Sequence, residues 1–273
     1  MLTLTSNFTI KKVGRVIFWL VTIACYLVVA SIGIFWLSDE TENCPTLSNV
    51  ALISIRGQLI AYGELPPEMG YSTDALNVVK QLETANGQEG IQYIILDIDS
   101  PGGDVTSAEN IVATIKHIGK PVYALIRGQG MSASFWIASA ADSIYAYPTS
   151  MLGNIGTTYS FTDNSVKNES EGVTFNQLSS GKLKDIANAD KVLTAEERAN
   201  LQENINSAFD VMAQSISDSR KIDLAQLLPL ADGRILTSKQ ALEAKLIDHM
   251  GTRYDLLDAL KYELGTEAII CEK

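Results

Sequence analysis

The stretch IQYIILDIDSPGGDV, residues 91–105, decides the fold. Its first nine residues are mainly apolar and include several β-branched side chains, which predicts a buried strand. The SPGG sequence then breaks the strand, and residues 106–119 follow with the apolar spacing of a helix. A buried strand that turns into a helix is the unit from which parallel sheets are built.

The same alternation continues on both sides of this stretch. Strands are predicted at residues 50–55, 121–126 and 143–148, and helices at residues 72–85 and 130–142. Strands that alternate with helices imply an α/β fold with a parallel sheet and crossover helices. Further helices are predicted at residues 194–221, where Thr194 and Glu197 fit a capping box, and at residues 237–248 and 253–264.

Charge and apolar content are unevenly distributed along the 273 residues. The net charge of -11 argues against a nucleic-acid partner, which requires a basic face. Residues 16–37 carry no charge, and as a helix they would span about 33 Å, enough to cross a bilayer. Basic residues precede this stretch and acidic residues follow it, so the positive-inside rule places the N-terminus in the cytoplasm.

These observations predict four parts of the chain. Residues 1–15 form a cytoplasmic segment, residues 16–37 a transmembrane anchor, residues 38–48 a linker, and residues 49–273 a domain on the extracytoplasmic side of the cell membrane. A cleaved signal peptide would have a shorter apolar core and a small-residue site after it, and a lipoprotein would not continue with apolar residues beyond Cys25. In an oxidising compartment Cys44 and Cys271 either pair or remain free thiols, and their spacing leaves both options open.

The stretch GMSASFWIASAAD, residues 130–142, contains three candidate nucleophiles, Ser132, Ser134 and Ser139. Ser132 falls at the predicted first turn of a helix, where the positive end of the dipole stabilises a developing alkoxide. The other two serines lie deeper in the helix. On spacing alone, a tightly packing small-residue helix is the simpler interpretation.

The usual partner of a catalytic serine is scarce. The chain has two histidines, His117 and His249, and both lie near helix ends, where interaction with the dipole explains them. The sequence shows no metal-binding spacing, P-loop or GxGxxG, so no metal or cofactor is predicted. The SPGG turn offers backbone N–H groups suited to an oxyanion hole, although an ordinary strand-to-helix turn also explains it.

Taken together, the motifs resemble the signal peptide peptidase A family, membrane-anchored serine peptidases of the Clp/crotonase-like superfamily. The resemblance runs from about Val50 to Gly265. Five stretches carry it in the order and spacing of the family: DIDSPGGDV at 97–105, residues 120–156, FNQLSSGKLKDIAN at 175–188, LTAEERANLQ at 193–202, and residues 231–251.

The resemblance implies a Ser/Lys dyad, which explains the shortage of histidine. The family's nucleophile lies ten residues before the aspartate of an AAD segment, which corresponds to Ser132. Its general base is the lysine before the aspartate of an SGxxKD-like segment, which corresponds to Lys184. The oxyanion hole would use the backbone N–H groups of Gly102 and of Ala133. No metal or other cofactor is implied.

A lysine acts as a base only when neutral, and burial of an ammonium group favours its neutral form. We therefore expect the Asp185 carboxylate to point away from Lys184. One departure stands out: the family has glycines after the nucleophile, as in ASGGYY, whereas this chain has MSASFW. Ala133 and Ser134 replace the glycines, which is expected to narrow the cleft and makes Ser134 a rival nucleophile.

The implied function is a membrane-tethered serine endopeptidase that cuts remnant signal peptides or other membrane-associated peptides. It would contact lipid through its N-terminal helix and form a homo-oligomeric ring around a central cavity, with a dyad that two subunits can share. Three alternatives are a related membrane peptidase with a stomatin-like substrate, a catalytically silent scaffold, and a crotonase-like acyl-CoA enzyme. The last is disfavoured by the anchor and by the Ser/Lys pair.

Overall fold

The computed structural model describes residues 19–26 and 44–273. The chain divides into two compact units, Met1–Asn43 and Cys44–Lys273. In the first unit residues 19–26 are helical, and the rest of the expected anchor, the cytoplasmic segment and most of the linker lie outside the described residues. In the part that is described, no helix combines the length and apolar character that a membrane crossing requires.

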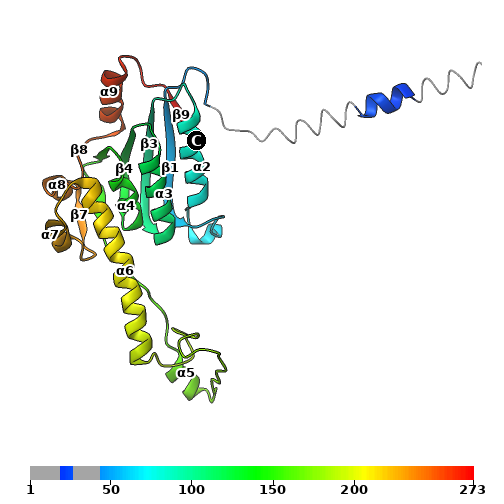
Figure 1. Cartoon of the computed structure of the whole chain (residues 1–273), viewed down its shortest axis with the longest axis vertical. Helices are drawn as coiled ribbons and strands as arrows, with labels where there is room; N and C mark the ends of the chain where they lie inside the picture. Colours follow the sequence, from blue (N-terminus) through cyan, green and yellow to red (C-terminus); the bar gives the residue numbers. More distant parts are fainter. Residues whose placement is uncertain (1–18, 27–43) are drawn as a thin grey trace, which may run out of the picture. The chain divides into compact units, whose positions relative to one another are not determined.

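The second unit is built on a largely parallel sheet (Figure 1). Its main path runs in the order β2–β1–β3–β4–β5–β8, and the strands are β1 (Val50–Ile60), β2 (Ser72–Asp74), β3 (Tyr93–Gly103), β4 (Val122–Met131), β5 (Ser143–Ala146) and β8 (His249–Met250). Three short strands extend it: β6 (Met151–Gly153) pairs with β4 and with the antiparallel β7 (Ile235–Thr237), and β9 (Ile270–Glu272) pairs with β1.

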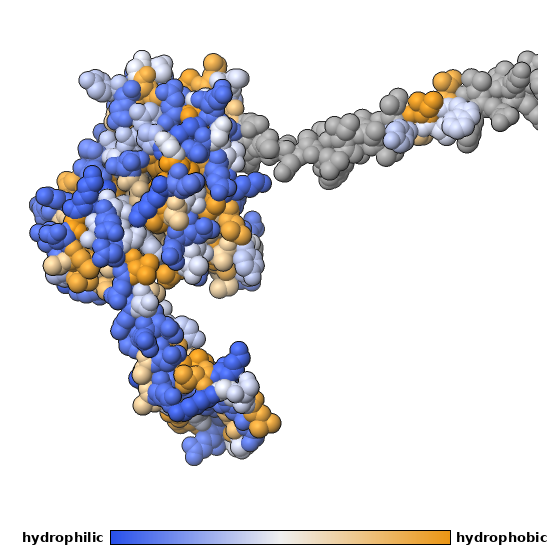
Figure 2. All heavy atoms as spheres, viewed as in Figure 1, coloured by the Kyte–Doolittle hydropathy of each residue, from blue (hydrophilic) through white to orange (hydrophobic). Residues whose placement is uncertain are grey.

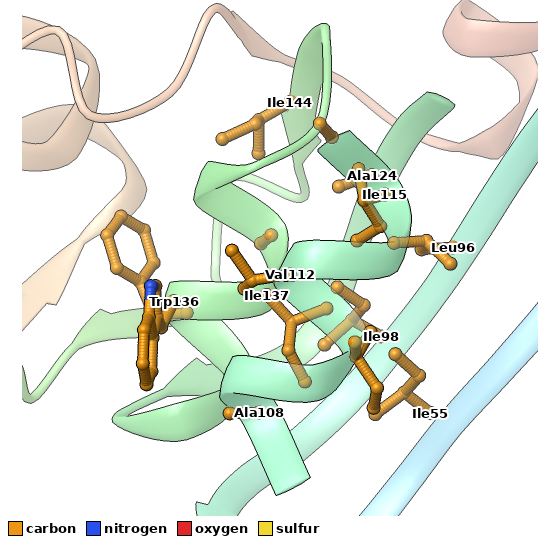
Figure 3. Close-up of a cluster of buried hydrophobic side chains, with 14 of the residues drawn as sticks. Ile55, Leu96, Ile98, Ala108, Val112, Ile115, Ala124, Trp136, Ile137 and Ile144 are labelled. Carbon is orange, nitrogen blue, oxygen red and sulfur yellow. The ribbon is translucent and has the colours of Figure 1, made fainter. Parts of the chain in front are cut away.

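Helices cover the sheet as the alternation of strands and helices predicts. The main core lies between the sheet and α2 (Ala75–Gly87), α3 (Val105–His117) and α4 (Ala133–Ser139). Figure 3 shows its centre, where side chains of the central strands meet those of α3 and α4; among them are Ile55, Leu96, Ile98, Ala108, Val112, Ile115, Trp136 and Ile137. A smaller apolar cluster forms where α9 (Arg253–Leu264) packs against the sheet. It contains the strand residues that alternate with those of the main core, among them Val50, Leu52 and Ile95.

Local signals place the starts of several helices. Asp74 and Asp104 cap α2 and α3, because each carboxylate accepts a hydrogen bond from a backbone N–H of the first turn. The capping box predicted at Thr194 and Glu197 is confirmed at the start of α6 (Ala195–Arg220). The remaining elements are η1 (Pro67–Met69), α5 (Ser165–Ser170), α7 (Leu224–Leu227), η2 (Leu228–Leu230) and α8 (Ser238–Glu243).

The helix predicted at residues 130–142 is shorter than expected. Strand β4 continues to Met131, and α4 begins only at Ala133. The reason is long-range pairing: Gln129 to Met131 pair with β6, so the first two residues of the predicted helix, Gly130 and Met131, stay extended. Ser132 therefore lies between a strand and a helix.

Residues 158–196, which we call the arm, extend away from the sheet (Figure 1). The arm contains α5 and the first residues of α6, and only partly buried or exposed residues occur from 156 to 196. Several of its apolar side chains are exposed, and Figure 2 shows apolar residues gathered on it; the largest exposures belong to Val166, Leu178 and Val192. The arm has little core of its own.

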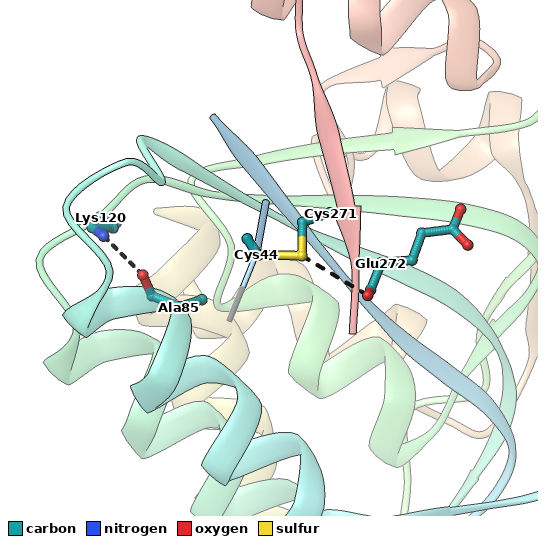
Figure 4. Close-up of a disulfide and its surroundings, with 5 residues drawn as sticks. All are labelled: Cys44, Ala85, Lys120, Cys271 and Glu272. Carbon is teal, nitrogen blue, oxygen red and sulfur yellow. Dashed lines mark hydrogen bonds between the residues drawn. A yellow bond between two sulfur atoms is a disulfide. The ribbon is translucent and has the colours of Figure 1, made fainter. Parts of the chain in front are cut away.

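A disulfide joins Cys44 to Cys271 (Figure 4). The sequence left open whether these two cysteines pair. They do, because β9 pairs with β1 and brings Cys271 to the start of the folded unit. The Asn49 side chain reinforces this junction, because its amide donates to the carbonyl of Glu267 and its oxygen accepts from the N–H of Ile269. Both ends of the unit are thus held to the same strand.

Candidate active site

Ser132 occupies a strained turn between β4 and α4. Its φ of 52° and ψ of -124° are rare for a residue with a side chain and cost about 1–3 kcal/mol. Two hydrogen bonds hold the conformation: the Ser132 N–H donates to the Gly153 carbonyl at 2.7 Å, and the Trp136 N–H donates to the Ser132 carbonyl at 3.0 Å. The neighbouring strand β6 therefore fixes the turn from one side.

The SPGG segment holds it from the other side. The prediction that SPGG breaks the strand is wrong, because pairing of Gly102 and Gly103 with β1 extends β3 to Gly103. Gly102 has a φ of 99°, and a Cβ there would lie 2.7 Å from the Met131 carbonyl oxygen and 2.9 Å from the Ala133 nitrogen. A Cβ on Gly103 would lie 2.1 Å from the carbonyl oxygen of Leu59. Both positions therefore require glycine, and the structure brings Gly102, Ser132 and Ala133 into direct contact.

The two glycines differ in their environment. The N–H of Gly102 donates to the buried Ser100 Oγ at 3.1 Å, whereas Gly103 lines the cleft that contains Ser132. The N–H of Ala133 belongs to the first turn of α4, where amides have no partner within the helix. The site thus offers backbone donors from two separate elements.

The cleft beside Ser132 has a volume of about 480 Å³. One wall comes from α6, whose residues 202, 205, 206 and 209 share a helix face, and another comes from residues 231–233. Its apolar lining consists of Val105, Ile205, Phe209 and Ala231, and its polar lining includes Asn154, Thr157, Thr158 and Asp232. The sequence argument missed these walls, although the spacing of the α6 residues is a signal that they share one face of the helix.

Ser134 and Ser139 are both fully buried. The Ser134 hydroxyl lies between the carbonyl oxygens of Ser100 and Met131, at 2.7 and 2.8 Å, and the Ser139 hydroxyl donates to the carbonyl of Trp136 at 2.6 Å. Neither lines the cleft, so the geometry does not support Ser134 as a rival nucleophile. Ala133 is fully buried too, and the expected narrowing of the cleft by these two side chains is wrong.

Lys184 lies on the arm, between α5 and α6, and does not line the cleft. Within the described residues its ammonium group forms no ion pair, whereas the nearby Lys182 and Lys191 pair with Glu196 and Glu197. The Asp185 carboxylate accepts hydrogen bonds from the Asn188 side chain at 3.1 and 3.2 Å. Within one chain, the structure does not bring Lys184 to Ser132.

Neither histidine belongs to the cleft. His117 lies in the last turn of α3, as its position before a strand suggested. His249 stacks on Tyr145 with ring centroids 4.4 Å apart, at the edge strand β8. Both therefore stay outside the arrangement around Ser132.

Comparison with known proteins agrees with this arrangement. The model of peptidase family S49 matches residues 114–267, and the Clp protease model matches residues 66–152. The chain belongs to peptidase family S49. It is therefore a serine peptidase, and the resemblance inferred from its motifs is confirmed.

Three relatives show how far the similarity extends. The chain is 29% identical to the Enterococcus faecium protein named as a signal peptide peptidase, SppA, over 86% of this chain and 70% of that protein. It is 30% identical to a Synechocystis protein named as a protease, over 69% of this chain and 72% of that protein. It is 29% identical to Protease 4 of Salmonella typhi over 76% of this chain, but covers only 33% of that longer protein.

Proposed function

We propose that this S49 peptidase is a membrane-anchored endopeptidase in which Ser132 is the nucleophile and Lys184 is the general base. The observation that carries the proposal is the strained Ser132 turn, which opens on a cleft and has the SPGG turn packed against it. Strain that the surroundings maintain at a cleft is characteristic of functional residues.

The chemistry follows from the groups present. The Ser132 hydroxyl attacks the peptide carbonyl and transfers its proton to the neutral lysine amine. The oxyanion is held by the N–H of Ala133 and by one of the two glycines. Gly102 is the donor predicted from the motif, but its N–H donates to Ser100 Oγ in this structure, and Gly103 is a second candidate because it lines the cleft. The protonated lysine then donates to the leaving amine, and water releases the acyl group from Ser132.

The base reaches the nucleophile from a neighbouring subunit in this proposal. Lys184 is exposed and without an ion-pair partner in the described structure, and it lies on an arm that exposes large apolar side chains. Docking of the arm on the next copy would bury those side chains and bring the amine to an apolar-walled cleft, which favours its neutral form. Repetition of this head-to-tail contact closes a ring.

The proposed substrates are remnant signal peptides or other membrane-associated peptides. The apolar wall formed by Val105, Ile205, Phe209 and Ala231 suits the apolar core of a signal peptide. The proposed anchor at residues 16–37 would keep the cleft near the membrane surface where such peptides are released. The Cys44–Cys271 disulfide supports an extracytoplasmic, oxidising location.

Cleavage of a fluorogenic signal-peptide sequence by the full chain tests the proposal. We expect Ser132→Ala and Lys184→Ala to lower kcat/KM by at least ~10³-fold, since members of a catalytic unit fail together. The matched controls are Ser139→Ala, a buried serine of α4, and Lys182→Ala, a lysine of the same loop. Full activity of the Ser132→Ala variant would refute the assignment of the nucleophile.

A further inference from the structure

The serine that replaces a family glycine, Ser134, has a structural partner in the SPGG turn. Its hydroxyl lies 2.7 Å from the carbonyl oxygen of Ser100 and 2.8 Å from that of Met131. Ser100 belongs to the end of β3, and Met131 belongs to the end of β4, directly before the nucleophile. One hydroxyl therefore bridges the two segments that form the site.

Ser100 extends this bridge to the glycine turn. Its own hydroxyl accepts the hydrogen bond of the Gly102 N–H at 3.1 Å, and its side chain, like that of Ser134, is fully buried. Ser100 also lies opposite Gly130 in the pairing of β3 with β4. The two serines form a continuous buried connection from the turn at Met131 to the amide of Gly102.

We infer that Ser134, acting through Ser100, is a positioning residue that sets the spacing between the two halves of the oxyanion hole. The inference rests on the proposed role of Ser132. One half of the hole comes from the two glycines at the end of β3 and the other from Ala133 at the start of α4. Donors on separate elements stabilise an oxyanion only if their separation is fixed before the reaction, and the serine bridge spans that separation.

If the role of Ser134 were purely structural, loss of another buried serine hydrogen bond in α4 would have the same effect on catalysis. Ser139 is also fully buried in α4, and its hydroxyl also donates to a backbone carbonyl, that of Trp136. It contacts neither the glycine turn nor Met131. Ser139→Ala is therefore a matched control, since it removes one buried serine hydrogen bond from the same helix without touching the oxyanion donors.

The test uses the full chain and two measurements for each variant. The first is the kinetics of peptide cleavage, which separates kcat from KM. The second is the affinity of a peptide aldehyde, whose hemiacetal with Ser132 places an oxyanion-like oxygen in the hole. Ser134→Ala should lower kcat and the aldehyde affinity by the same factor, roughly tenfold, which is less than the ~10²–10³-fold loss of a donor itself. KM should change less than about twofold, and Ser139→Ala should change none of these values.

Two outcomes would overturn the inference. One is wild-type kcat and aldehyde affinity in Ser134→Ala, and the other is an equal loss in Ser134→Ala and Ser139→Ala. Ser134→Gly serves as the second variant, because it removes the hydroxyl and restores the residue that the family has at this position, and it should reproduce the Ser134→Ala loss. A wild-type chain that neither cleaves peptides nor forms an aldehyde adduct would instead refute the proposed function, so the two failures are distinguishable.

Discussion

The turn at Ser132 is densely packed and hydrogen-bonded, whereas the arm is largely exposed. Around Ser132, three segments of the chain meet, the flanking serines are fully buried, and even the strained backbone is held by hydrogen bonds on both sides. On the arm, no residue before Glu197 is buried and large apolar side chains are exposed. The difference indicates that the turn is preorganised by its own chain, whereas the role proposed for the arm requires a neighbouring chain.

The largest expected effect concerns the closure of the folded unit. The disulfide links residues 227 positions apart, and the chain-entropy model gives roughly 5 kcal/mol of stabilisation for such a loop. We expect the double variant Cys44→Ser and Cys271→Ser to lower the free energy of unfolding by up to this amount, measured by urea denaturation. Because the disulfide lies away from the cleft, kcat of the folded variant should stay at the wild-type value, and a parallel loss of kcat would contradict this separation.

The second prediction concerns the contact between the glycine turn and the Ser132 turn. A Cβ at Gly102 would collide with Met131 and Ala133, so Gly102→Ala should displace the two turns and lower kcat/KM by about 10²-fold. Gly119→Ala is the matched control, because a Cβ there would meet nothing within 4 Å. Wild-type activity in Gly102→Ala would show that the site tolerates movement and is not preorganised.

The smallest expected effect is a pH dependence of the arm. The Lys191 ammonium lies 2.6 Å from the Glu197 carboxylate and is the main cause that lowers the Glu197 pKa to about 2, with the Thr194 N–H as a further cause. Because the folded pKa lies below the ordinary value of 4.5, the stabilisation is complete above about pH 4.5 and is lost as the pH falls towards 2. The start of α6 should therefore lose amide-exchange protection in this range before the sheet does.

Lys191→Met should remove most of this dependence on pH. Lys182→Met is the control, since the pair of Lys182 with Glu196 is largely exposed and contributes little. Equal loss of protection at the start of α6 and in the sheet over the same pH range would contradict a local effect of the Lys191–Glu197 pair.

Local signals in the sequence account for much of the fold. The apolar run at residues 91–99 predicts most of β3, and the capping box at Thr194 and Glu197 predicts the start of α6, because both depend on neighbouring residues. The extension of β4 to Met131 and the disulfide were not decided by local pattern. They depend on pairing with β6 and β9, which are distant in the sequence.

In the candidate site, too, the sequence motifs predict some features, whereas others depend on contacts that only the folded chain makes. The motif spacing selected Ser132 and the SPGG turn, and their contact follows from the common edge at which neighbouring parallel strands end. The motif left Ser134 open as a rival nucleophile, because only its burial and its hydrogen bonds to the carbonyl oxygens of Ser100 and Met131 argue against that role. It also could not give the position of Lys184, since the direction of α6 carries the arm away from the sheet.

Mixed assemblies of two inactive variants test the central claim most directly. Ser132→Ala and Lys184→Ala are co-expressed as full chains, and peptide cleavage by the co-assembled protein is compared with that of each variant alone. If the site combines Ser132 of one chain with Lys184 of the next, random mixing in equal amounts restores about a quarter of the wild-type sites. Absence of activity in co-assembled, folded rings would contradict the account, because it would mean that the two residues do not meet between chains.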